Sequence, residues 1–415
     1  MEVHDLIGIG FGPSNLALAI ALNEKPQKER PLNTLFLERQ PVFAWHKHMM
    51  LEDTRMQISF LKDLVSLRNP KSHFTFVNYL HQKQRLQDFI NLKTFYPSRY
   101  EFNDYLNWAA SHFEDHCRYG EEVVSITPEK TGDEVSALRV QSINSDGTPH
   151  ERLTRNLVVS IGGAPHIPEA FLSLKADARV FHSSSYLQDI RCRSNIRNVA
   201  IIGSGQSAAE IFMDLQKHPD SPNIDIIMRG HTLRVSDNSP FVNEIFNSDF
   251  VDFVYHHPDK SQALIKEFWH TNYSAPDVEL AEKMFEIFYN QKIKSQYKHR
   301  FLKSHTVTSA QAHAEGVHIN TYDMVGNSTQ GHTYDAVILA TGYVRNQHET
   351  LLAPLLPYLG DLRADRQYRL GSTENFKPAV FLQGACEDTH GLSDTLLSVI
   401  STRVENIRSA LVDAY

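Results

Sequence analysis

Cysteine is scarce in this sequence of 415 residues. The three cysteines, Cys117, Cys192 and Cys386, lie far apart, and no two of them form a Cys-x-x-Cys pair. An odd number of widely spaced cysteines excludes a disulfide scaffold, a zinc ribbon and a dithiol redox centre. Scarce cysteine is also typical of proteins in the reducing cytoplasm, where we expect this one. Redox chemistry by this chain therefore requires a bound cofactor.

Long hydrophobic runs and excess basic charge are lacking as well. No run approaches the roughly 18 apolar residues that suggest a membrane-spanning helix, and the first residues include Glu2 and Asp5 rather than a basic and then apolar leader. We therefore expect no membrane span and no export signal. The chain has 41 Lys and Arg against 49 Asp and Glu, a formal charge of −8. This balance argues against a nucleic-acid surface, because phosphate binding needs clustered basic residues.

Glycine and proline are too few for a collagen-like or linker-like chain, with 19 and 18 residues. Hydrophobic residues make up 41% of the chain and charged residues 22%, as in ordinary globular proteins. With roughly 150 residues per domain, the length favours two or three domains.

The first motif is a glycine-rich turn between a short strand and a helix. Residues 4–10 predict a buried strand, and residues 13–22 carry apolar residues at helical spacing. Gly10 permits the tight turn, and Gly12 lets the backbone approach a pyrophosphate at the N-terminus of the helix. A second strand at residues 34–38 ends in an acid that can accept hydrogen bonds from ribose hydroxyls. The predicted cofactor-binding residues of this unit are Gly10, Gly12, Pro13, Ser14, Asn15 (in place of the usual third glycine) and Glu38.

A second unit of the same kind begins about 190 residues later. A strand at residues 199–203 leads into a glycine turn, a helix over about 206–217 and a strand at 224–228. Arg229 follows that strand where an acid would suit NAD, and an arginine suits the 2′-phosphate of NADPH. Two such units favour FAD on the first and NADPH on the second. The predicted cofactor-binding residues here are Gly203, Gly205, Gln206, Ser207 and Arg229.

A third motif is a hydrophobic strand at residues 335–340 that ends in Thr341, Gly342 and Tyr343. Flavoproteins with two nucleotide domains often carry such a strand ending in Ala-Thr-Gly. Alone it is an ordinary buried strand, but beside the two glycine turns it corroborates them. We include these three residues among the cofactor-binding set.

The motifs predict an α/β fold with two Rossmann-like dinucleotide-binding domains and a small helical substrate-binding insertion. Residues 1–165, completed by 335–415, form the predicted FAD domain, and 166–334 form the NADPH domain. The insertion is placed at 237–300, a region rich in aromatics, Asn and His whose pattern is mostly helical. A last strand at 380–383 leads into a helix from about Asp394 onward.

Several longer segments carry a family resemblance: 56–66 (MQISFLKDLVS), 89–101 (FINLKTFYPSRYE), 239–246 (SPFVNEIF), 271–274 (TNYS) and 390–398 (HGLSDTLLS). Through them the chain resembles the L-ornithine N5-monooxygenase branch of the microbial N-hydroxylating flavin monooxygenases, over residues 5–403. The resemblance implies that FAD, NADPH and molecular oxygen convert the side-chain amine of L-ornithine to N5-hydroxyornithine, through a C4a-hydroperoxyflavin. This product is the precursor of hydroxamate siderophores.

The resemblance also implies roles for individual residues near the flavin. Gln57 matches a glutamine beside the isoalloxazine, and Trp45 and His46 match a pair near the flavin. Ser393 matches a residue at the junction of substrate and flavin, although the backbone of Leu392 offers an alternative contact.

For the substrate, Lys62 and Asn243 match the residues that hold the α-carboxylate and α-amino ends. A cation near a carboxylate gives a charge-assisted hydrogen bond. Asn272 matches an asparagine near the reacting amine and the nicotinamide ribose. The residues expected to act in catalysis and substrate binding are Gln57, Lys62, Asn243, Asn272 and Ser393.

Alternatives remain open at this point. The lysine branch shares the 57–62 neighbourhood, whereas diamine hydroxylases, which act on putrescine or cadaverine, generally lack a lysine at Lys62. Segment 181–186 is similar to a linker of Baeyer–Villiger flavoproteins, but their longer signature is missing. A non-catalytic redox sensor would have no use for Lys62, Asn243 and Asn272 together. An acid–base role of His390 is disfavoured, and the resemblance leaves a homo-oligomer open.

Overall fold

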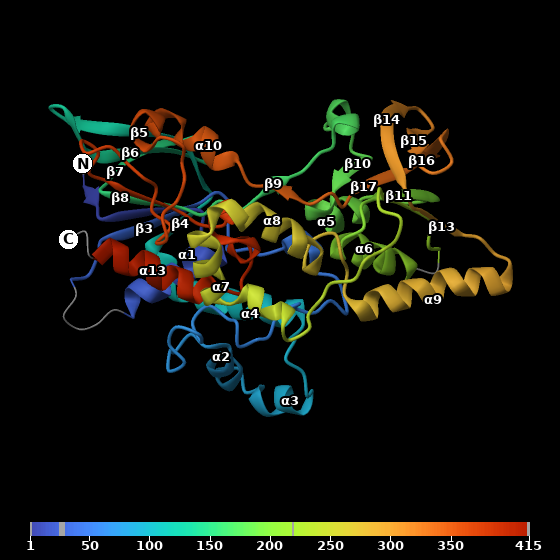
Figure 1. Cartoon of the computed structure of the whole chain (residues 1–415), viewed down its shortest axis with the longest axis horizontal. Helices are drawn as coiled ribbons and strands as arrows, with labels where there is room; N and C mark the ends of the chain where they lie inside the picture. The colour runs from blue at the N-terminus through green and yellow to red at the C-terminus, as the bar shows by residue number, and fades with distance from the viewer. Residues whose placement is uncertain (1, 25–29, 218–219, 413–415) are drawn as a thin grey trace.

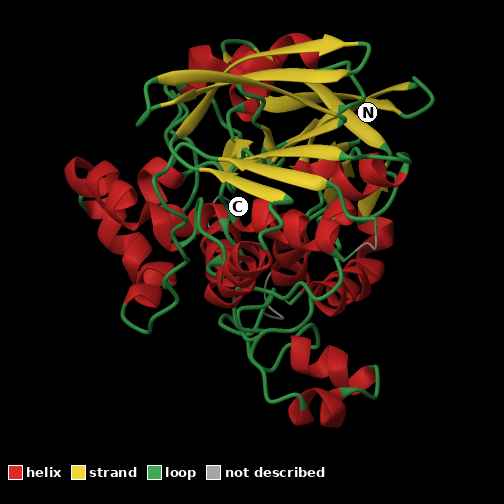
Figure 2. Cartoon of the chain, turned by 90° about the vertical axis from the view of Figure 1, so that its right-hand side faces the viewer, coloured by secondary structure: helices red, strands yellow, loops and turns green. Residues whose placement is uncertain are grey.

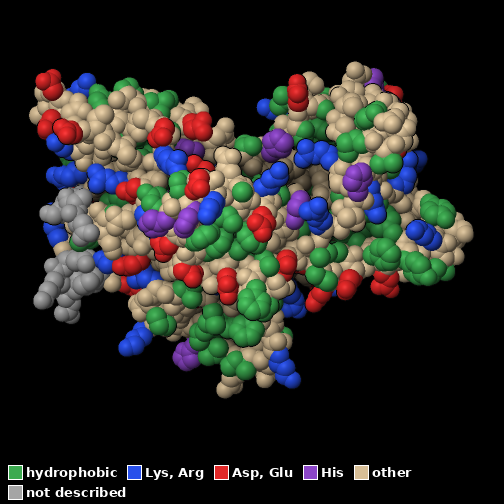
Figure 3. Space-filling model, in the orientation of Figure 1, with side chains coloured by type: hydrophobic (Ala, Val, Ile, Leu, Met, Phe, Trp, Pro, Cys, Tyr) green, Lys and Arg blue, Asp and Glu red, His purple; other side chains and the backbone are tan. Residues whose placement is uncertain are grey.

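Two parallel β-sheets, each with its own helices, organise the chain. The computed structural model describes residues 2–24, 30–217 and 220–412. The two units lie side by side, joined by short crossing segments, with a notch between them on one face (Figures 1 and 3). Figure 2 shows most strands gathered on one side of the molecule and most helices on the other. The α/β class with two Rossmann-like units is confirmed.

The first unit is built on a five-stranded parallel sheet in the order β19-β8-β2-β3-β4. Its inner strands are short and wholly buried, which is the pattern of a parallel sheet covered on both faces. The strands are β2 (Leu6–Ile9), β3 (Thr34–Glu38), β4 (Cys117–Tyr119), β8 (Asn156–Val159) and β19 (Ala379–Leu382).

Further elements complete this unit. A mixed sheet in the order β1-β7-β6-β5 comprises β1 (Val3–His4), β7 (Pro149–Thr154), β6 (Glu134–Asn144) and β5 (Glu121–Thr131). The helices are α1 (Pro13–Asn23), α2 (Phe76–Gln82), α3 (Leu86–Asn91), α4 (Arg99–Ala110), α10 (Gln347–Leu352), α11 (Leu356–Leu359), α12 (Glu387–His390) and α13 (Ile400–Val412).

The second unit has a five-stranded parallel sheet in the order β10-β17-β11-β12-β13. Alternate residues of its central strand enter different cores, with Val199 and Ile201 on one face and Ala200 and Ile202 on the other. The strands are β10 (Val180–His182), β11 (Asn198–Ile202), β12 (Asn223–Ile227), β13 (His299–Leu302) and β17 (Ala336–Leu339). Helices α5 (Tyr186–Arg191), α6 (Gln206–Gln216) and α9 (Val278–Lys294), and the antiparallel strands β14 (His305–His313), β15 (Gly316–Asp323) and β16 (Ser328–Tyr334), belong to it.

Strand β17 differs from the predicted domain boundary. The sequence motifs place residues from 335 onward in the first unit, but β17 pairs with β10 and β11 in the second sheet. Its four residues are apolar and fully buried, and either sheet offers such a place, so hydrophobicity could not choose between them. The chain returns to the first unit only after β18 (Tyr343–Val344), which pairs with β9 (Ala164–Pro165).

The predicted insertion 237–300 also divides in two. Its first part forms η5 (Val242–Phe246), α7 (Ser248–His256), α8 (Pro258–Phe268) and η6 (Trp269–Thr271), which pack against α12 and η8 (Leu392–Thr395) of the first unit. Its second part, α9 and β13, belongs to the second unit, because Met284 lies in that core and β13 pairs with β12. The helical character is confirmed for the first part, but the boundary of the insertion is wrong.

Two smaller expectations can be checked here. The helix predicted from about Asp394 begins at Ile400, because the turn η8 is followed by extended backbone at Leu396. All three cysteines are free, with Cys117 and Cys386 buried and Cys192 exposed. Within the described ranges, no helix is both long and apolar enough to cross a bilayer.

Candidate active site

A cavity of about 690 Å³ opens at the glycine turn of the first unit. This volume is within the range of small-molecule sites, roughly 300–1,000 Å³. Its lining comes from the turn, the end of β3, the segment after β8 and the loop that follows α12. Predicted residues in the lining are Gly10, Gly12, Pro13, Ser14, Glu38 and Trp45. Residues that sequence reasoning missed include Gly162, Arg345, Gln383, Asp394 and Arg403.

The two glycines of this turn are required for different reasons. Gly10 has φ +80°, and a Cβ there would lie 2.4 Å from the carbonyl oxygen of Ser160. Gly12 is the N-cap of α1 with φ −82°, and no described atom lies within 4 Å of the place its Cβ would occupy. The fold therefore needs Gly10, whereas Gly12 leaves open space in front of the helix N-terminus, where an anionic pyrophosphate is favoured.

Asn15 replaces the usual third glycine and fastens the turn. Its Nδ2 donates to the carbonyl oxygens of Ile9 at 3.3 Å and Gly10 at 2.7 Å. Its Oδ1 accepts from Nε2 of Gln383 at 3.0 Å. Asn15 is fully buried, and these hydrogen bonds hold the turn in shape.

Glu38 is held by backbone amides at the end of β3. Its two carboxylate oxygens accept from the N–H groups of Phe11 at 2.7 Å and Gln40 at 2.8 Å. The side chain is only 8% exposed but lines the cavity. The remaining lone pairs can accept hydrogen bonds from ribose hydroxyls, as the sequence predicts.

Arg403 on α13 is buried and reaches the same turn. One guanidinium nitrogen donates to Oγ of Ser14 at 2.7 Å, and another lies 3.0 Å from Oδ1 of Asp394. The second oxygen of Asp394 accepts from the N–H of Cys386 at 2.7 Å. This buried ion pair joins the glycine turn to the loop that carries Ser393. A charged residue inside an amphipathic C-terminal helix gives no sequence signal for such a role.

The second glycine turn faces the segment that contains Asn272. Gly203 has φ +135°, and a Cβ there would lie 2.3 Å from the carbonyl oxygen of Ala340. Gly205 is the N-cap of α6, and its Cβ would lie 3.5 Å from Cα of Ser274. Gln206 and Ser207 begin α6. Arg229 follows β12, is exposed and has no hydrogen-bond or ion-pair partner among the described residues, so it remains available to a 2′-phosphate.

Thr341, Gly342 and Tyr343 lie in the connection between the units and not in the lining of the first cavity. Thr341 donates its hydroxyl to the carbonyl oxygen of His166, and the carbonyl oxygen of Gly342 accepts from the N–H of His166 at 2.9 Å. Tyr343 pairs with Pro165 across β18 and β9. The contacts of these residues therefore fix the path of the chain between the two units.

Two of the predicted substrate residues come together where η5 packs against η8. Asn243 lies in η5 and donates its Nδ2 to the carbonyl oxygen of Asn238 at 2.7 Å. Ser393 lies in η8, is fully buried, and its Oγ has no partner among the described residues. Directly after it, Asp394 and Thr395 line the first cavity, so η8 separates that cavity from η5.

Asn272 is tied to the same place through its neighbour. Tyr273 shares a hydrogen bond with Thr395 of η8 and stacks on Trp269 at 4.4 Å between ring centroids. The side-chain amide of Asn272 is half-buried and has no hydrogen-bond partner within the described chain. Leu392, the alternative contact to Ser393, is buried at the start of η8.

Lys62 stands in a loop that its neighbour Asp63 shapes. The buried Asp63 carboxylate accepts from the N–H groups of Val65 at 2.9 Å, Ser66 at 2.6 Å and Phe76 at 2.8 Å. The Lys62 ammonium is half-buried and pairs with no described carboxylate. Burial lowers its pKa from the ordinary 10.5, because a cation loses hydration there without gaining a partner. An incoming carboxylate would supply that partner.

Trp45 packs against Phe102 and lines the first cavity. His46 has φ +51° and an exposed side chain that meets the Trp45 ring edge-on at 4.5 Å. Gln57 donates its Nε2 to the carboxylate of Asp277 at 3.1 Å. Asp277 belongs to the second unit, so Gln57 lies at the junction of both.

His390 is a structural residue in this arrangement. It is fully buried, stacks on Tyr368 at 3.9 Å and shares a hydrogen bond with Thr389 at 2.8 Å. Burial is the main cause that lowers its pKa to about 4, so the imidazole is neutral at physiological pH. An imidazole with so low a pKa is a weak base, in keeping with the sequence argument that disfavours an acid–base role.

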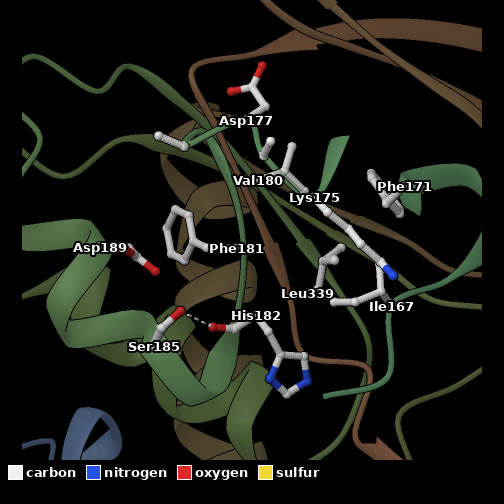
Figure 4. Close-up of a pocket in the computed structure, with 12 residues that line it drawn as sticks. Ile167, Phe171, Lys175, Asp177, Val180, Phe181, His182, Ser185, Asp189 and Leu339 are labelled. Atoms are coloured by element: carbon white, nitrogen blue, oxygen red, sulfur yellow. Dashed lines mark hydrogen bonds between the residues drawn. The ribbon is translucent and has the colours of Figure 1, made fainter. Parts of the chain in front are cut away.

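A smaller cavity of about 290 Å³ lies in the second unit beside β10 and η3 (Glu169–Leu174). Figure 4 shows Phe171, Val180 and Leu339 along its walls, and Ser185 donating to the carbonyl oxygen of His182 at 3.1 Å. Of the described residues that line it, none belongs to the predicted site. We therefore take the junction between the units, and not this cavity, as the candidate active site.

The first cavity fits a flavin dinucleotide by its own features. It has an open helix N-terminus at Gly12, a carboxylate at the end of β3, and the Oε1 of buried Gln383 without a partner among the described atoms. The second turn fits a nicotinamide dinucleotide through α6 and the unpaired Arg229.

Comparison with known proteins agrees with this geometry. A family model described as L-lysine 6-monooxygenase/L-ornithine 5-monooxygenase matches residues 2–345. The chain is 50% identical to the L-ornithine N(5)-monooxygenase of Pseudomonas aeruginosa over 415 residues, 99% of this chain and 94% of that protein. The solved ornithine hydroxylase PvdA from Pseudomonas aeruginosa has a TM-score of 0.96 at 50% identity over 100% of both chains. The ornithine N-hydroxylase KtzI from Kutzneria sp. 744, solved with reduced FAD, NADP+ and L-ornithine, has a TM-score of 0.93 at 35% identity over 99% of both chains.

Proposed function

The chain belongs to the L-lysine 6-monooxygenase/L-ornithine 5-monooxygenase family, and we propose that it hydroxylates the side-chain amine of L-ornithine with FAD, NADPH and molecular oxygen. The product, N5-hydroxyornithine, serves hydroxamate siderophore biosynthesis. The observation that carries the proposal is a flavin-type cavity lined by Asp394 and Thr395, directly after Ser393, whose buried hydroxyl has no partner among the described residues.

The two cofactors have separate places in the proposal. Gly10, Gly12, Ser14 and Glu38 hold FAD, and Arg403 fixes the turn that receives its pyrophosphate. Residues of the second turn and Arg229 hold NADPH. Reduced FAD supplies the oxygen-transfer chemistry, and the surrounding protein excludes water and positions the amine.

In this proposal, Lys62 recognises the α-carboxylate of the amino-acid substrate. Its half-buried, unpaired ammonium can bind the α-carboxylate of ornithine as a charge-assisted hydrogen bond. The bound carboxylate would stabilise the charged form of Lys62, which burial destabilises in the free protein. Asn243 stands at the α-amino end of the substrate.

Asn272 and Ser393 orient the reacting amine in the proposal. The half-buried amide of Asn272 and the buried hydroxyl of Ser393 have no partner in the described chain, so each has unused hydrogen-bonding capacity that the amine could take up. The amine is protonated in water, with a pKa of roughly 10.4 as in lysine. Desolvation in the site favours the neutral form, which is the form that can take an oxygen atom. Placement therefore contributes more than a general base.

L-Lysine is the second candidate, because the matched family covers both amino acids. Lysine has the same carboxylate for Lys62 but one more methylene before the amine. A diamine lacks that carboxylate and would leave Lys62 unpaired. The high identity to L-ornithine N(5)-monooxygenases favours ornithine.

A substrate panel tests the proposal. Purified protein loaded with FAD receives NADPH and, in parallel, equal concentrations of ornithine, lysine or putrescine, and hydroxylated amine is quantified. We expect product mainly from ornithine. Product from lysine alone would move the enzyme to the lysine branch, and product from putrescine would show that Lys62 does not select a carboxylate. Peroxide without hydroxylated amine from any of them would contradict the assigned reaction.

A further inference from the structure

Asp277 occupies the N-cap of α9, with φ −58° and ψ 148°. An aspartate at this position normally accepts a hydrogen bond from a backbone N–H of the first helical turn. Among the described residues of α9, none donates such a bond to the Asp277 side chain. Helix α9 therefore lacks the usual side-chain capping hydrogen bond, and the Asp277 carboxylate has other partners.

Two glutamines from different units donate to this carboxylate. Gln57 of the first unit donates its Nε2 to Oδ1 at 3.1 Å, and Gln206 of the second unit donates its Nε2 to Oδ2 at 3.0 Å. The backbone N–H of Asp277 donates in return to Oε1 of Gln206 at 2.8 Å. This reciprocal pair fixes which end of the Gln206 amide faces Asp277.

The hydrogen bonds continue from Gln206 back to the first unit. Gln206 Nε2 also donates to Oε1 of Glu210 at 2.9 Å. Arg99, the first residue of α4, donates to both oxygens of Glu210 at 2.7 and 3.0 Å. Glu210 is only 5% exposed. The network therefore leaves the first unit at Gln57, passes through Asp277 and Gln206, and returns to the first unit at Arg99.

Both glutamines stand next to predicted cofactor contacts. Gln206 follows Gly205 at the N-terminus of α6, where the nicotinamide dinucleotide is expected. Gln57 is the residue that the family resemblance places beside the isoalloxazine. Asp277 therefore joins, through two hydrogen bonds, the neighbourhoods of the two cofactors.

We propose that Asp277 is a positioning residue that couples the FAD unit to the NADPH unit by holding Gln57 and Gln206 on its two carboxylate oxygens. This inference rests on the proposed function. In coupled turnover one NADPH, one proton, one dioxygen and one neutral amine give NADP+, one hydroxylamine and one water. In uncoupled turnover NADPH, a proton and dioxygen give NADP+ and hydrogen peroxide. Loss of the Asp277 hydrogen bonds increases the fraction of turnover that gives peroxide and lowers the affinity for NADP+.

Three variants of the full-length, FAD-loaded protein test this role. Asp277→Ala removes both acceptors, and Asp277→Asn keeps one acceptor oxygen. Glu279→Gln is the matched control, since this exposed acid in the first turn of α9 contacts neither glutamine. The measurements are NADP+ affinity by calorimetry, amide hydrogen exchange over residues 203–210, and the fraction of oxidised NADPH recovered as peroxide.

For Asp277→Ala we expect NADP+ binding about tenfold weaker, from the loss of hydrogen bonds to a charged group. Exchange over 203–210 becomes faster and the peroxide fraction rises several-fold. Asp277→Asn lies between the alanine variant and the wild type, and Glu279→Gln matches the wild type.

Wild-type affinity, exchange and coupling in Asp277→Ala would overturn the inference. Lower thermal stability without any change in these three quantities would also overturn it, since Asp277 would then only support α9. If Asp277→Ala does not fold, the same criteria apply to Asp277→Asn. A wild type that makes no hydroxylated ornithine would instead refute the proposed function, while NADP+ affinity and exchange still report on Asp277.

Discussion

Lys62 combines a half-buried position with a missing partner, and this combination makes its role testable. Asp63 closes the loop by accepting from three backbone N–H groups, and the half-buried Lys62 forms no ion pair with a described carboxylate. We expect Lys62→Ala to raise the KM for ornithine about 10- to 100-fold, the worth of one hydrogen bond to a charged group. The kcat should change much less, because the carboxylate lies away from the reacting amine.

Steady-state kinetics with ornithine measure this effect. Lys71→Ala is the control, since Lys71 is an exposed lysine in the same region. An unchanged KM in Lys62→Ala would show that another group holds the carboxylate.

The pH dependence of ornithine binding follows from the lowered pKa of Lys62. Below that pKa the ammonium is charged and attracts the carboxylate, and above it the charge is lost. The KM for ornithine should therefore rise on the alkaline side, starting below pH 10.5, the ordinary pKa of lysine. Lys62→Arg stays charged throughout, so its KM should lack this rise. The same alkaline rise in both proteins would assign the titration to another group.

Single residues also show the reach of sequence reasoning. Gly10 and Glu38 were predictable, because a turn between strand and helix has fixed needs for backbone and charge. Asn15 stands at the third-glycine position. Its bonds to the carbonyl oxygens of Ile9 and Gly10 are local, but its bond from Gln383 forms only because β19 brings Gln383 to it. Asp277 was missed because an N-cap aspartate predicts a helix start, and its diversion to two distant glutamines is a tertiary feature.

At the scale of elements, the two glycines of the turn before α1 have different roles: the fold requires Gly10, and in the proposal cofactor binding requires Gly12. Gly10→Ala places a Cβ against the carbonyl of Ser160 at positive φ, at a cost of at least about 1 kcal/mol. It should lower both the unfolding free energy and FAD binding. Gly12→Ala has open space for its Cβ, so it should keep the stability of the apoprotein and lose only FAD affinity.

Urea unfolding and flavin absorbance of the purified variants measure both quantities. Equal FAD content in Gly12→Ala and the wild type would contradict a cofactor pyrophosphate in that space.

Helix α13 is fixed to the cofactor turn by the buried pair of Arg403 and Asp394, whose side chains are 1% and 0% exposed. Arg403→Met leaves Asp394 buried without its cation and should cost about 3–5 kcal/mol of unfolding free energy. FAD retention should fall with it, because Ser14 loses its tie to α13. Asp394→Asn in the Arg403→Met background should restore part of the stability. An Arg403→Met variant as stable as the wild type would show that the ion pair does not hold α13 in place.

Elements were predictable in kind more than in assignment. The apolar runs that form β2, β8, β11 and β17 can be predicted as buried strands from the sequence. The sheet to which each strand belongs depends on its pairing, which the runs do not encode. The helical region after Asp237 was recognised by its pattern, yet its division between α12 and the second core depends on packing that no local spacing encodes.

At the scale of the whole molecule, the chain crosses between the units at β9 and β18, and these two crossings pair with each other. The network through Asp277 joins the units at a second place. The candidate active site is at the junction of the two units, so its geometry depends on how the units are held together. The number of nucleotide units and their order could be predicted from the glycine turns, but this second attachment could not.

The central claim is that an oxygen atom from dioxygen is delivered to the side-chain nitrogen of ornithine at the expense of NADPH. The most direct measurement supplies dioxygen labelled with the heavy isotope to FAD-loaded enzyme, NADPH and ornithine, and follows product mass together with NADPH and peroxide. We expect one labelled oxygen in each N5-hydroxyornithine, and product that accounts for most of the NADPH consumed. Unlabelled product, or peroxide formed in place of hydroxylated ornithine, would contradict the account.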